Sequence, residues 1–403
     1  MILPVEEKLY ELADKSETLR SSCILTYFDT PQDSTRHGLL SHRTLEMNGL
    51  KTCSEHQYSI AQDILTLGIT TVGFDGASTT SLQTFSALNG MKRSERSEDD
   101  GVTRFKYDSI GRILSTTVSA GTPNAATSHT VYQAASHEAP ATMHSTDLAG
   151  VLQTTAYDGL GRIIGIEEQD CDSPDKAAIA HARVIFAARH DGLGRLIEQT
   201  HTDWWEEVAR PMTTTFEYDD WGQVKTTIHP DGRKEHRTYD PVTRTETYWF
   251  EGMGKSITRF NDFGKPDTVE AFDRKEQSLG KIVHGYDGWG RAVSQTDAVG
   301  NRTTFGYDVF NRLCRSELPD GHVVETEFAI HSPETLPTRM KMSGQSLGQQ
   351  TFDGLGRLTA STIGGRTCSA GYEGGSGQPT WQKSASGERV EFDYARDFGG
   401  RLL

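Results

Sequence analysis

The chain has 403 residues, of which 35% are hydrophobic and 9% aromatic, and its formal net charge at pH 7 is −15. This acidic balance argues against nucleic acid or an anionic membrane as a partner, because both bind basic surfaces. We also expect no membrane span and no signal peptide. The sequence lacks the apolar run of roughly 18 residues and the basic segment with an apolar core that these features need.

The N-terminal region, residues 1–84, carries no clear repeat and is predicted to be flanking or degenerate β structure. A short helix is predicted within residues 5–20, because Leu9, Leu12 and Ala13 would share one helical face. The remainder of the region reads as strands and turns.

A seven-residue motif, Tyr-Asp-x-x-Gly-Arg-Leu, recurs over residues 85–403. Copies at Tyr218, Tyr239 and Phe260 begin 21 residues apart, as do those at Tyr286 and Tyr307. The step of 26 residues from 260 to 286 is interpreted as one repeat with a loop insertion. Such self-similarity at a fixed period is typical of repeat proteins.

Each motif copy is predicted to be a turn between two strands. The aromatic residue ends a strand, the aspartate accepts hydrogen bonds from the turn backbone, and the glycine supplies a left-handed position. Asparagine, which tolerates that conformation, replaces the glycine at Asn311. The predicted turn residues are Tyr107, Asp108, Gly111, Arg112, Tyr157, Asp158, Gly161, Arg162, Asp191, Gly194, Arg195, Tyr218, Asp219, Gly222, Tyr286, Asp287, Gly290, Arg291, Tyr307, Asp308, Asn311, Arg312, Asp353, Gly356 and Arg357.

A second turn separates successive motifs. It reads His229-Pro-Asp-Gly232, Asp297-Ala-Val-Gly300 and Leu318-Pro-Asp-Gly321, and Pro-Asp-Gly between strand-like runs indicates a hairpin. Each repeat is therefore predicted to be one β-hairpin, stacked on its neighbours in a continuous twisted sheet. The predicted fold is all-β, a spiralling sheet of stacked hairpins over residues 85–403, with an inserted loop or short helix at 171–181.

The sequence gives little support for a phosphate-binding, metal-binding or sugar-binding site. Glu251-Gly-Met-Gly-Lys-Ser256 ends like a phosphate-binding loop but has Trp249 at the first glycine position. His201-Thr-Asp-Trp-Trp-Glu-Glu207 fits a solvated hairpin tip better than a metal or sugar site. We therefore predict no catalytic residue, no cofactor and no metal. The repeated arginine is expected to bond a neighbouring repeat's aspartate or carbonyl, forming a ladder along the sheet.

The motif, its 21-residue step and its Pro-Asp-Gly spacers resemble the RHS/YD-repeat family, over about three quarters of the chain. The aromatic-rich turns look most like the shell-forming B and C components of bacterial insecticidal ABC (Tc) toxins and like RHS effectors. The resemblance implies a hollow β-shell that holds a cytotoxic C-terminal domain. No Asp-Pro-x-Gly element of the self-cleaving members occurs, and no variable domain follows Leu403. The chain therefore resembles an internal segment of a larger shell or a truncated gene product.

The resemblance further implies a non-catalytic structural role, with other segments or subunits of a toxin complex and an encapsulated toxin polypeptide as partners. It implies export by a specialised route, with the protein cytoplasmic beforehand and extracellular afterwards. The alternative is a cell-surface adhesin or carbohydrate-binding module, with glycans as partners. A row of exposed aromatic side chains on one sheet face would favour that alternative.

Overall fold

All of the regular structure is β-strand. The computed structural model describes residues 4–13, 16–96, 101–170, 182–205, 208–395 and 401–402. Within these ranges 32 strands form one sheet, and β33 (Tyr394–Ala395) and β34 (Arg401–Leu402) form a separate two-stranded ribbon. The predicted all-β fold of one long antiparallel sheet is confirmed.

The contacts divide the chain into two units, which are described separately. The first unit comprises Met1–Thr127 and Phe305–Leu403, and the second comprises Ser128–Thr304. The N-terminal part of the first unit contains β1 (Glu6–Ala13), β2 (Ser16–Tyr27), β3 (Leu40–Met47), β4 (Leu50–Ala61), β5 (Ile64–Val72), β6 (Ser78–Ser86), β7 (Lys92–Arg96), β8 (Thr103–Tyr107) and β9 (Ile113–Val118). Its C-terminal part contains β25 (Leu313–Glu317), β26 (Val323–Phe328), β27 (Pro337–Met342), β28 (Gln345–Phe352), β29 (Leu358–Ile363), β30 (Arg366–Gly371), β31 (Trp381–Lys383) and β32 (Arg389–Glu391).

The second unit lies between two border strands, β10 (Ala126–Gln133) and β24 (Arg302–Tyr307). Between them lie β11 (Ala141–Thr146), β12 (Leu152–Tyr157), β13 (Ile163–Gln169), β14 (Ala182–His190), β15 (Leu196–Trp205), β16 (Val208–Tyr218), β17 (Val224–Ile228), β18 (Lys234–Asp240), β19 (Thr245–Phe250), β20 (Lys255–Phe260), β21 (Pro266–Phe272), β22 (Ser278–Tyr286) and β23 (Ala292–Thr296).

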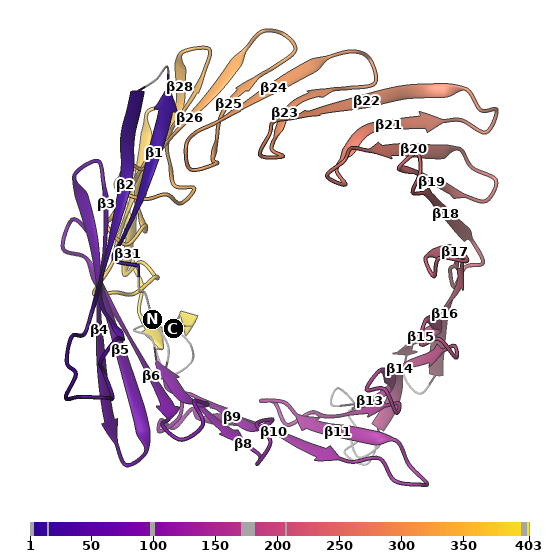
Figure 1. Cartoon of the computed structure of the whole chain (residues 1–403), viewed down its shortest axis with the longest axis horizontal. Coiled ribbons are helices and arrows are strands. Elements are labelled where there is room, and N and C mark those ends of the chain that lie inside the picture. The colour runs from indigo at the N-terminus through magenta and orange to yellow at the C-terminus, as the bar shows by residue number, and fades with distance from the viewer. Residues whose placement is uncertain are drawn as a thin grey trace. The chain divides into compact units, whose positions relative to one another are not determined.

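Strands that follow each other in the chain pair antiparallel, for example β14 with β15 and β22 with β23 (Figure 1). The motif turns join an even-numbered strand to the next strand, as at β12–β13, β16–β17 and β28–β29. Because the strand direction alternates along such a meander, the motif turns of each unit lie at the same end of its strands. The intervening turns, such as the one between β17 and β18, lie at the opposite end of the strands.

The motif aromatic stands at a β-bulge, which the sequence did not predict. Ala156 faces Gly165, but the next residue, Tyr157, faces Ile163, so the register slips by one. A type I turn that ends in a left-handed residue leads into a bulge of this kind. The same slip accompanies Tyr107, His190, Tyr218, Phe260, Tyr286, Phe328 and Phe352.

The loop insertion predicted between residues 260 and 286 is wrong. The turn at 261–265 closes with a hydrogen bond from Asn261 N to Lys265 O, and the turn at 273–277 closes likewise from Asp273 N to Gln277 O. The additional residues instead lengthen the strands: β21 and β22 have 7 and 9 residues, whereas β23 and β24 have 5 and 6. Longer strands pair more of the added backbone groups than a loop would.

The N-terminal helix predicted within residues 5–20 is also wrong, because β1 and β2 occupy this segment. Backbone pairing runs from Glu6 opposite Ile24 to Ala13 opposite Ser16. Residues 23–27 read Cys-Ile-Leu-Thr-Tyr, a run with high strand propensity, and pairing along both strands outweighs a weak local helical pattern. The loop or short helix predicted at 171–181 lies outside the described residues.

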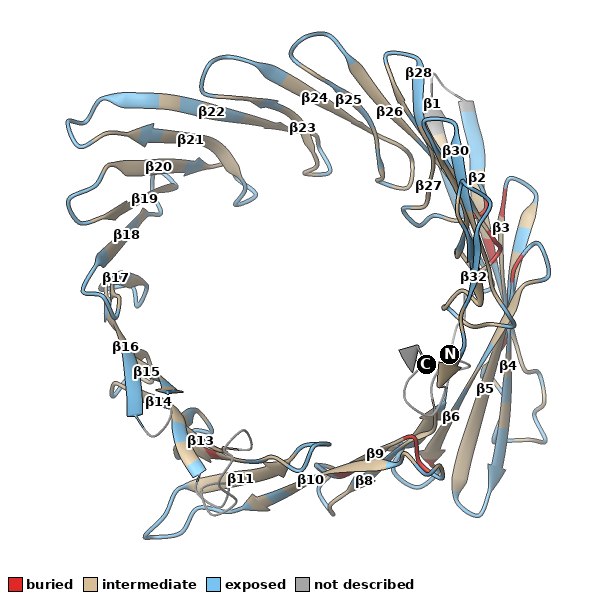
Figure 2. Ribbon diagram, turned by 180° about the vertical axis from the view of Figure 1, so that it is seen from behind, coloured by how far each residue is buried: buried red, intermediate tan, exposed pale blue. Residues whose placement is uncertain are grey.

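Few residues of the sheet are fully buried (Figure 2). Among the described residues, the buried hydrophobic side chains are Cys23, Met47, Ala120 and Ala329. Most other side chains are half-buried or exposed, because a single sheet has no second layer to cover its faces. Hydrogen bonds of the strands and turns must therefore contribute much of the stability that a core supplies elsewhere.

Gly161→Val is expected to destabilise the chain by about 1–3 kcal/mol, since a β-branched residue would be forced into the left-handed region at φ 78°. Chemical denaturation measures the change. Gly159→Val in the same turn is the matched control, because Val309 already occupies the equivalent position of another copy. Equal stability of the two variants would contradict the assignment of backbone geometry to Gly161.

Candidate functional site

The aspartate of each motif closes its own turn. Asp158 Oδ1 accepts hydrogen bonds from the backbone N–H of Leu160 at 2.9 Å and of Arg162 at 3.0 Å, and Oδ2 accepts from Arg162 Nε at 2.6 Å. Gly161 N donates to Asp158 O at 3.0 Å. One carboxylate thus satisfies two backbone donors and holds a guanidinium, which makes these charge-assisted bonds the strongest in the turn.

The same arrangement recurs along the chain. The Nε–Oδ2 distance is 2.6–2.7 Å in each aspartate–arginine pair, at 108/112, 158/162, 191/195, 287/291, 308/312 and 353/357. Where glutamine replaces arginine, at Gln223, the backbone bonds to Asp219 remain at 2.8–2.9 Å. Positive φ, the backbone geometry predicted for the glycine position, is found at Gly111, Gly161, Gly194, Gly222, Gly290, Asn311 and Gly356.

The turn bonds lower the pKa of the Asp158 and Asp191 carboxyl groups. The hydrogen bond from Arg162, together with the backbone N–H groups, lowers the pKa of Asp158 from 3.8 to about 2. Backbone and side-chain bonds from Arg195 lower the pKa of Asp191 in the same direction. A carboxyl group that is tied up in this way is poorly suited to proton transfer at neutral pH.

The arginine also reaches the next turn at the same end of the strands. Arg312 Nη1 donates to the carbonyl oxygens of Ser332 and Glu334, both at 2.9 Å. Arg357 Nη1 donates likewise at 2.9 and 2.7 Å, to the carbonyl oxygens of residues 374 and 376. The predicted ladder is therefore found for neighbouring carbonyls at these two positions, but the aspartate partner belongs to the arginine's own turn.

The motif aromatic completes the link between repeats. Tyr218 donates its hydroxyl to Leu196 O at 2.6 Å, and the guanidinium of Arg195 lies 4.6 Å from the centre of its ring. Tyr372 bonds Leu358 O at 2.9 Å under Arg357 in the same way. Cation–π contacts of this kind contribute about 0.5–1 kcal/mol at exposed sites. Each tyrosine thus joins its own repeat to the preceding one.

The other candidate motifs lie in strands and in a turn between strands. The segment at 251–256 joins two strands, β19 and β20, without the following helix that a phosphate-binding loop requires. In the segment at 201–207, Trp204 Nε1 donates to Val184 O at 3.0 Å, and Arg183 lies over the indole; residues 206–207 lie outside the described ranges. No metal-ligating cluster occurs among the described residues.

The first unit contains a contact between distant segments, which we call the clasp: Asn48, Gly73, Phe74 and Asp75 on one side, and Ile330, His331 and Gly354 on the other. Gly354 N donates to Asp75 Oδ2 at 2.9 Å across 279 residues of sequence. Asn48 Nδ2 donates to Ile330 O at 2.7 Å. A Cβ on Gly73 would lie 2.5 Å from the backbone of Gly354, so only glycine permits this approach.

The clasp buries one histidine. His331 is 8% exposed, its ring lies 4.7 Å from that of Phe74, and Nε2 has no hydrogen-bond partner among the described residues. Burial lowers the pKa of His331 below its usual 6.5. The negative charges of Asp75, Asp353 and Glu334 oppose that shift. The clasp therefore favours a neutral imidazole.

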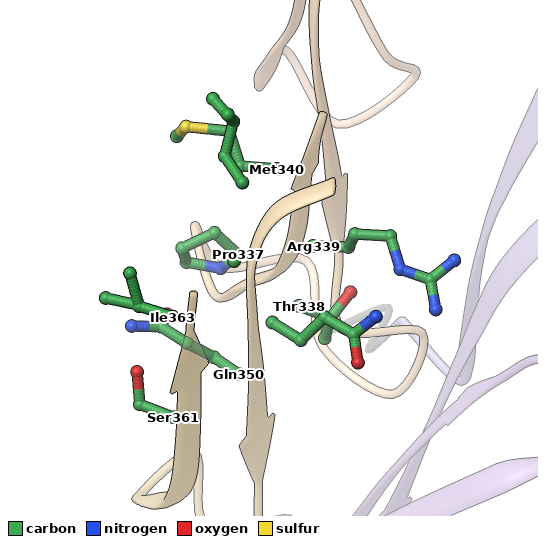
Figure 3. Close-up of a pocket in the computed structure, with 10 residues that line it drawn as sticks. Pro337, Thr338, Arg339, Met340, Gln350, Ser361 and Ile363 are labelled. Carbon is green, nitrogen blue, oxygen red and sulfur yellow. The ribbon is translucent and has the colours of Figure 1, made fainter. Parts of the chain in front are cut away.

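A shallow hollow lies on the sheet face formed by β27, β28 and β29 (Figure 3). Its volume is about 220 Å³. Gly348 faces Met340 on one neighbouring strand and Ile363 on the other, so the missing side chain leaves a gap between two apolar ones. Arg339 extends away from Met340 and Ile363. The hollow has the character of a packing gap and brings no titratable groups together.

The fold and its turns define a β-hairpin repeat protein. The family model of the RHS repeat matches residues 286–323, which confirms the predicted resemblance at this repeat. This match spans β23 and β24 with the motif turns at 287–291 and 308–312.

Solved toxin structures align with the chain at low similarity. A TcdB2–TccC3 crystal structure matches at 11% identity and TM-score 0.28, with 96% of this chain and 33% of that chain covered. The Photorhabdus luminescens Tc holotoxin pore matches at 10% identity and TM-score 0.27, with 94% and 30% covered. The chain thus spans about a third of the length of these solved chains. No curated protein sequence matches, and no helix in the described ranges is long and apolar enough to cross a membrane.

Acid is expected to weaken the turns. Because the folded chain lowers the pKa of Asp158 from 3.8 to about 2, the unfolded chain takes up the proton first, so stability present above pH 3.8 falls as the pH drops toward 2. Urea unfolding at about pH 4.5 and about pH 2.5 measures the effect. Asp158→Asn should reduce the difference, and a stability that is flat across this window would contradict the turn geometry.

The clasp is expected to loosen at a milder pH. The pKa of His331 is lowered in the folded chain. The contribution of its neutral imidazole to stability is therefore fully present above pH 6.5 and declines as the pH falls below that value. Hydrogen exchange of the Gly354 amide, corrected for intrinsic rates, should show less protection at about pH 5.5 than at about pH 8. His331→Phe keeps a ring against Phe74 and should remove this difference. Persistence of the difference in that variant would assign it to another group.

Proposed function

We propose that the chain is a non-catalytic structural segment of an RHS-repeat toxin shell, which carries or encloses a toxic polypeptide. Its partners would be other segments or subunits of a toxin complex and the enclosed polypeptide. We further propose that the assembly leaves the producing cell by a specialised route. The observation that carries the proposal is a sheet of 32 strands with almost no core of its own.

A sheet of this kind is suited to being a wall. Its apolar side chains remain half-buried on both faces, so a second surface is needed to cover at least one of them. The motif residues that have acid–base or anion-binding chemistry are used in closing turns, as Asp308 and Arg312 are. The net charge of −15 favours solubility of the chain.

The carbohydrate-binding alternative lacks the feature that would favour it. The most exposed aromatic side chains in the described ranges are Trp221, Phe263 and Trp289, at 79%, 79% and 82%. All three lie in turns between strands, so they form no row on a sheet face. We therefore do not propose glycans as partners.

Protease protection of a passenger tests the carrier role. An unfolded marker polypeptide is joined after Leu403 of the full chain, and its digestion by trypsin is followed by mass spectrometry. We expect digestion several-fold slower than that of the same marker added as a separate molecule, because an enclosed chain is inaccessible to the protease. The marker in mixture controls for inhibition of trypsin, and equal rates in the two samples would contradict the proposal.

A further inference from the structure

One motif turn in the first unit is occupied by a hairpin tip. The turn at 353–357, Asp-Gly-Leu-Gly-Arg, receives the tip at 73–77, Gly-Phe-Asp-Gly-Ala, which joins β5 to β6. Asp75 Oδ2 accepts the N–H of Gly354, and both Asp353 and Gly354 are buried. Leu355, the residue after Gly354, is only partly exposed.

The turn itself does not require glycine at the position of Gly354. Its φ is not in the left-handed region, and other copies carry Ser109, Asp220 or Val309 there. What glycine provides is room: a Cβ on Gly354 would lie 2.7 Å from Gly73 Cα and would also collide with the carboxylate of Asp75. Glycine at this position is therefore explained by the docked tip.

Three motif turns in the second unit have the same glycine, and no described residue is docked on that glycine. The turns at 158–162 and 191–195 repeat the sequence Asp-Gly-Leu-Gly-Arg, and the turn at 287–291 reads Asp-Gly-Trp-Gly-Arg. The glycines are Gly159, Gly192 and Gly288. Each is exposed, none has positive φ, and a Cβ on any of them would meet nothing within 4 Å among the described residues.

The apolar residue that follows each of these glycines is strongly exposed. Leu160, Leu193 and Trp289 are 78%, 81% and 82% exposed, in contrast to Leu355 in the occupied turn. Open space at the glycine and a strongly exposed apolar side chain thus distinguish these three turns from the occupied one.

The chemistry of the occupant follows from Asp75. Its Oδ1 bonds the N–H of Ala77 at 3.0 Å, and its Oδ2 is left for Gly354 because alanine has no polar side chain. In the similar tip at 229–233, Oδ2 of Asp231 is taken by the side chain of Arg233. In the tip at 318–322, His322 takes the equivalent oxygen at 2.9 Å. A docking tip therefore needs an Asp-Gly pair followed by a small residue.

We propose that the turns at 158–162, 191–195 and 287–291 are docking points for a β-hairpin tip of another repeat sheet, one that carries an aspartate, a glycine and then a small residue. This inference rests on the proposed structural role, and it names the chemistry of the partner. The carboxylate binds the glycine N–H, as Asp75 binds that of Gly354 in the occupied turn. The chain's own tip at 73–77 is already engaged, so a second molecule or another segment supplies the partner.

The first experiment measures binding of a hairpin probe to the full chain. The probe is a cyclised, fluorescent peptide with the sequence of residues 70–80, and binding is followed by anisotropy. We expect saturable binding. The peptide with Asp75→Ala should bind roughly tenfold or more weakly, as expected for loss of a hydrogen bond to a charged group. A peptide with Ser78→Ala is the matched control and should bind as the parent does.

Chain variants locate the probe. The triple variant Gly159→Ala, Gly192→Ala and Gly288→Ala fills the docking space without straining the backbone, so it should fold normally and lose binding roughly tenfold or more. Ser109→Ala, in a turn that already carries a Cβ, should leave binding unchanged. Unchanged binding to the triple variant, no binding to the parent chain, or equal binding of the Asp75→Ala peptide would each overturn the proposal.

A second measurement uses the chain's own tip. Gly354→Ala should expel the tip at 73–77, which then becomes available to the vacant turns of another copy. Sedimentation velocity should show concentration-dependent association that the parent lacks and that the three Gly→Ala changes suppress. Association that survives those changes would overturn the assignment of the docking turns. If the parent chain does not bind the probe but still protects the passenger, this inference alone is rejected. If the parent chain binds the probe but does not protect the passenger, the proposed function alone is rejected.

Discussion

The aspartate carboxylate of the motif turn is the group on which the rest of this structure depends. In one turn it accepts two backbone N–H groups and the Nε of arginine, as Asp287 does at 3.0, 2.9 and 2.7 Å. Closing the turn sets the left-handed residue, and the left-handed residue sets the bulge that follows. In a single sheet with few buried side chains, this chain of local constraints replaces the packing that fixes register in a two-layer domain.

The links between repeats are extensions of the same turn. Arginine is held by its own aspartate through Nε, which leaves Nη1 for the next turn and the guanidinium face for the next aromatic ring, as in Arg312 against Phe328 at 4.5 Å. Each contact contributes roughly 0.5–3 kcal/mol, and the contributions add up over the repeats. The clasp is the exception, since it joins segments that are remote in sequence.

Periodicity predicted the hairpins, the turn positions and the left-handed residues, because these depend on a few neighbouring side chains. It did not decide the partner of the arginine, since its own and a neighbouring aspartate both satisfy the repeat spacing. It misread residues 5–20 and the long step before Tyr286, where pairing between strands outweighs local pattern. The contact of Asp75 with Gly354 had no signal in the repeat, because turns with no described contact at this position, such as that of Gly159, carry the same glycine.

Because all motif turns of a unit lie at the same end of its strands, the chain can change length only in certain ways. Every motif turn follows an even-numbered strand, so residues can be added between turns, as in β21 and β22, without disturbing the order. Insertion of a single strand would transfer every later aspartate, arginine and tyrosine to the opposite ends of the strands. The number of repeats in this architecture therefore changes by whole hairpins. Insertions and deletions must add or remove an even number of strands.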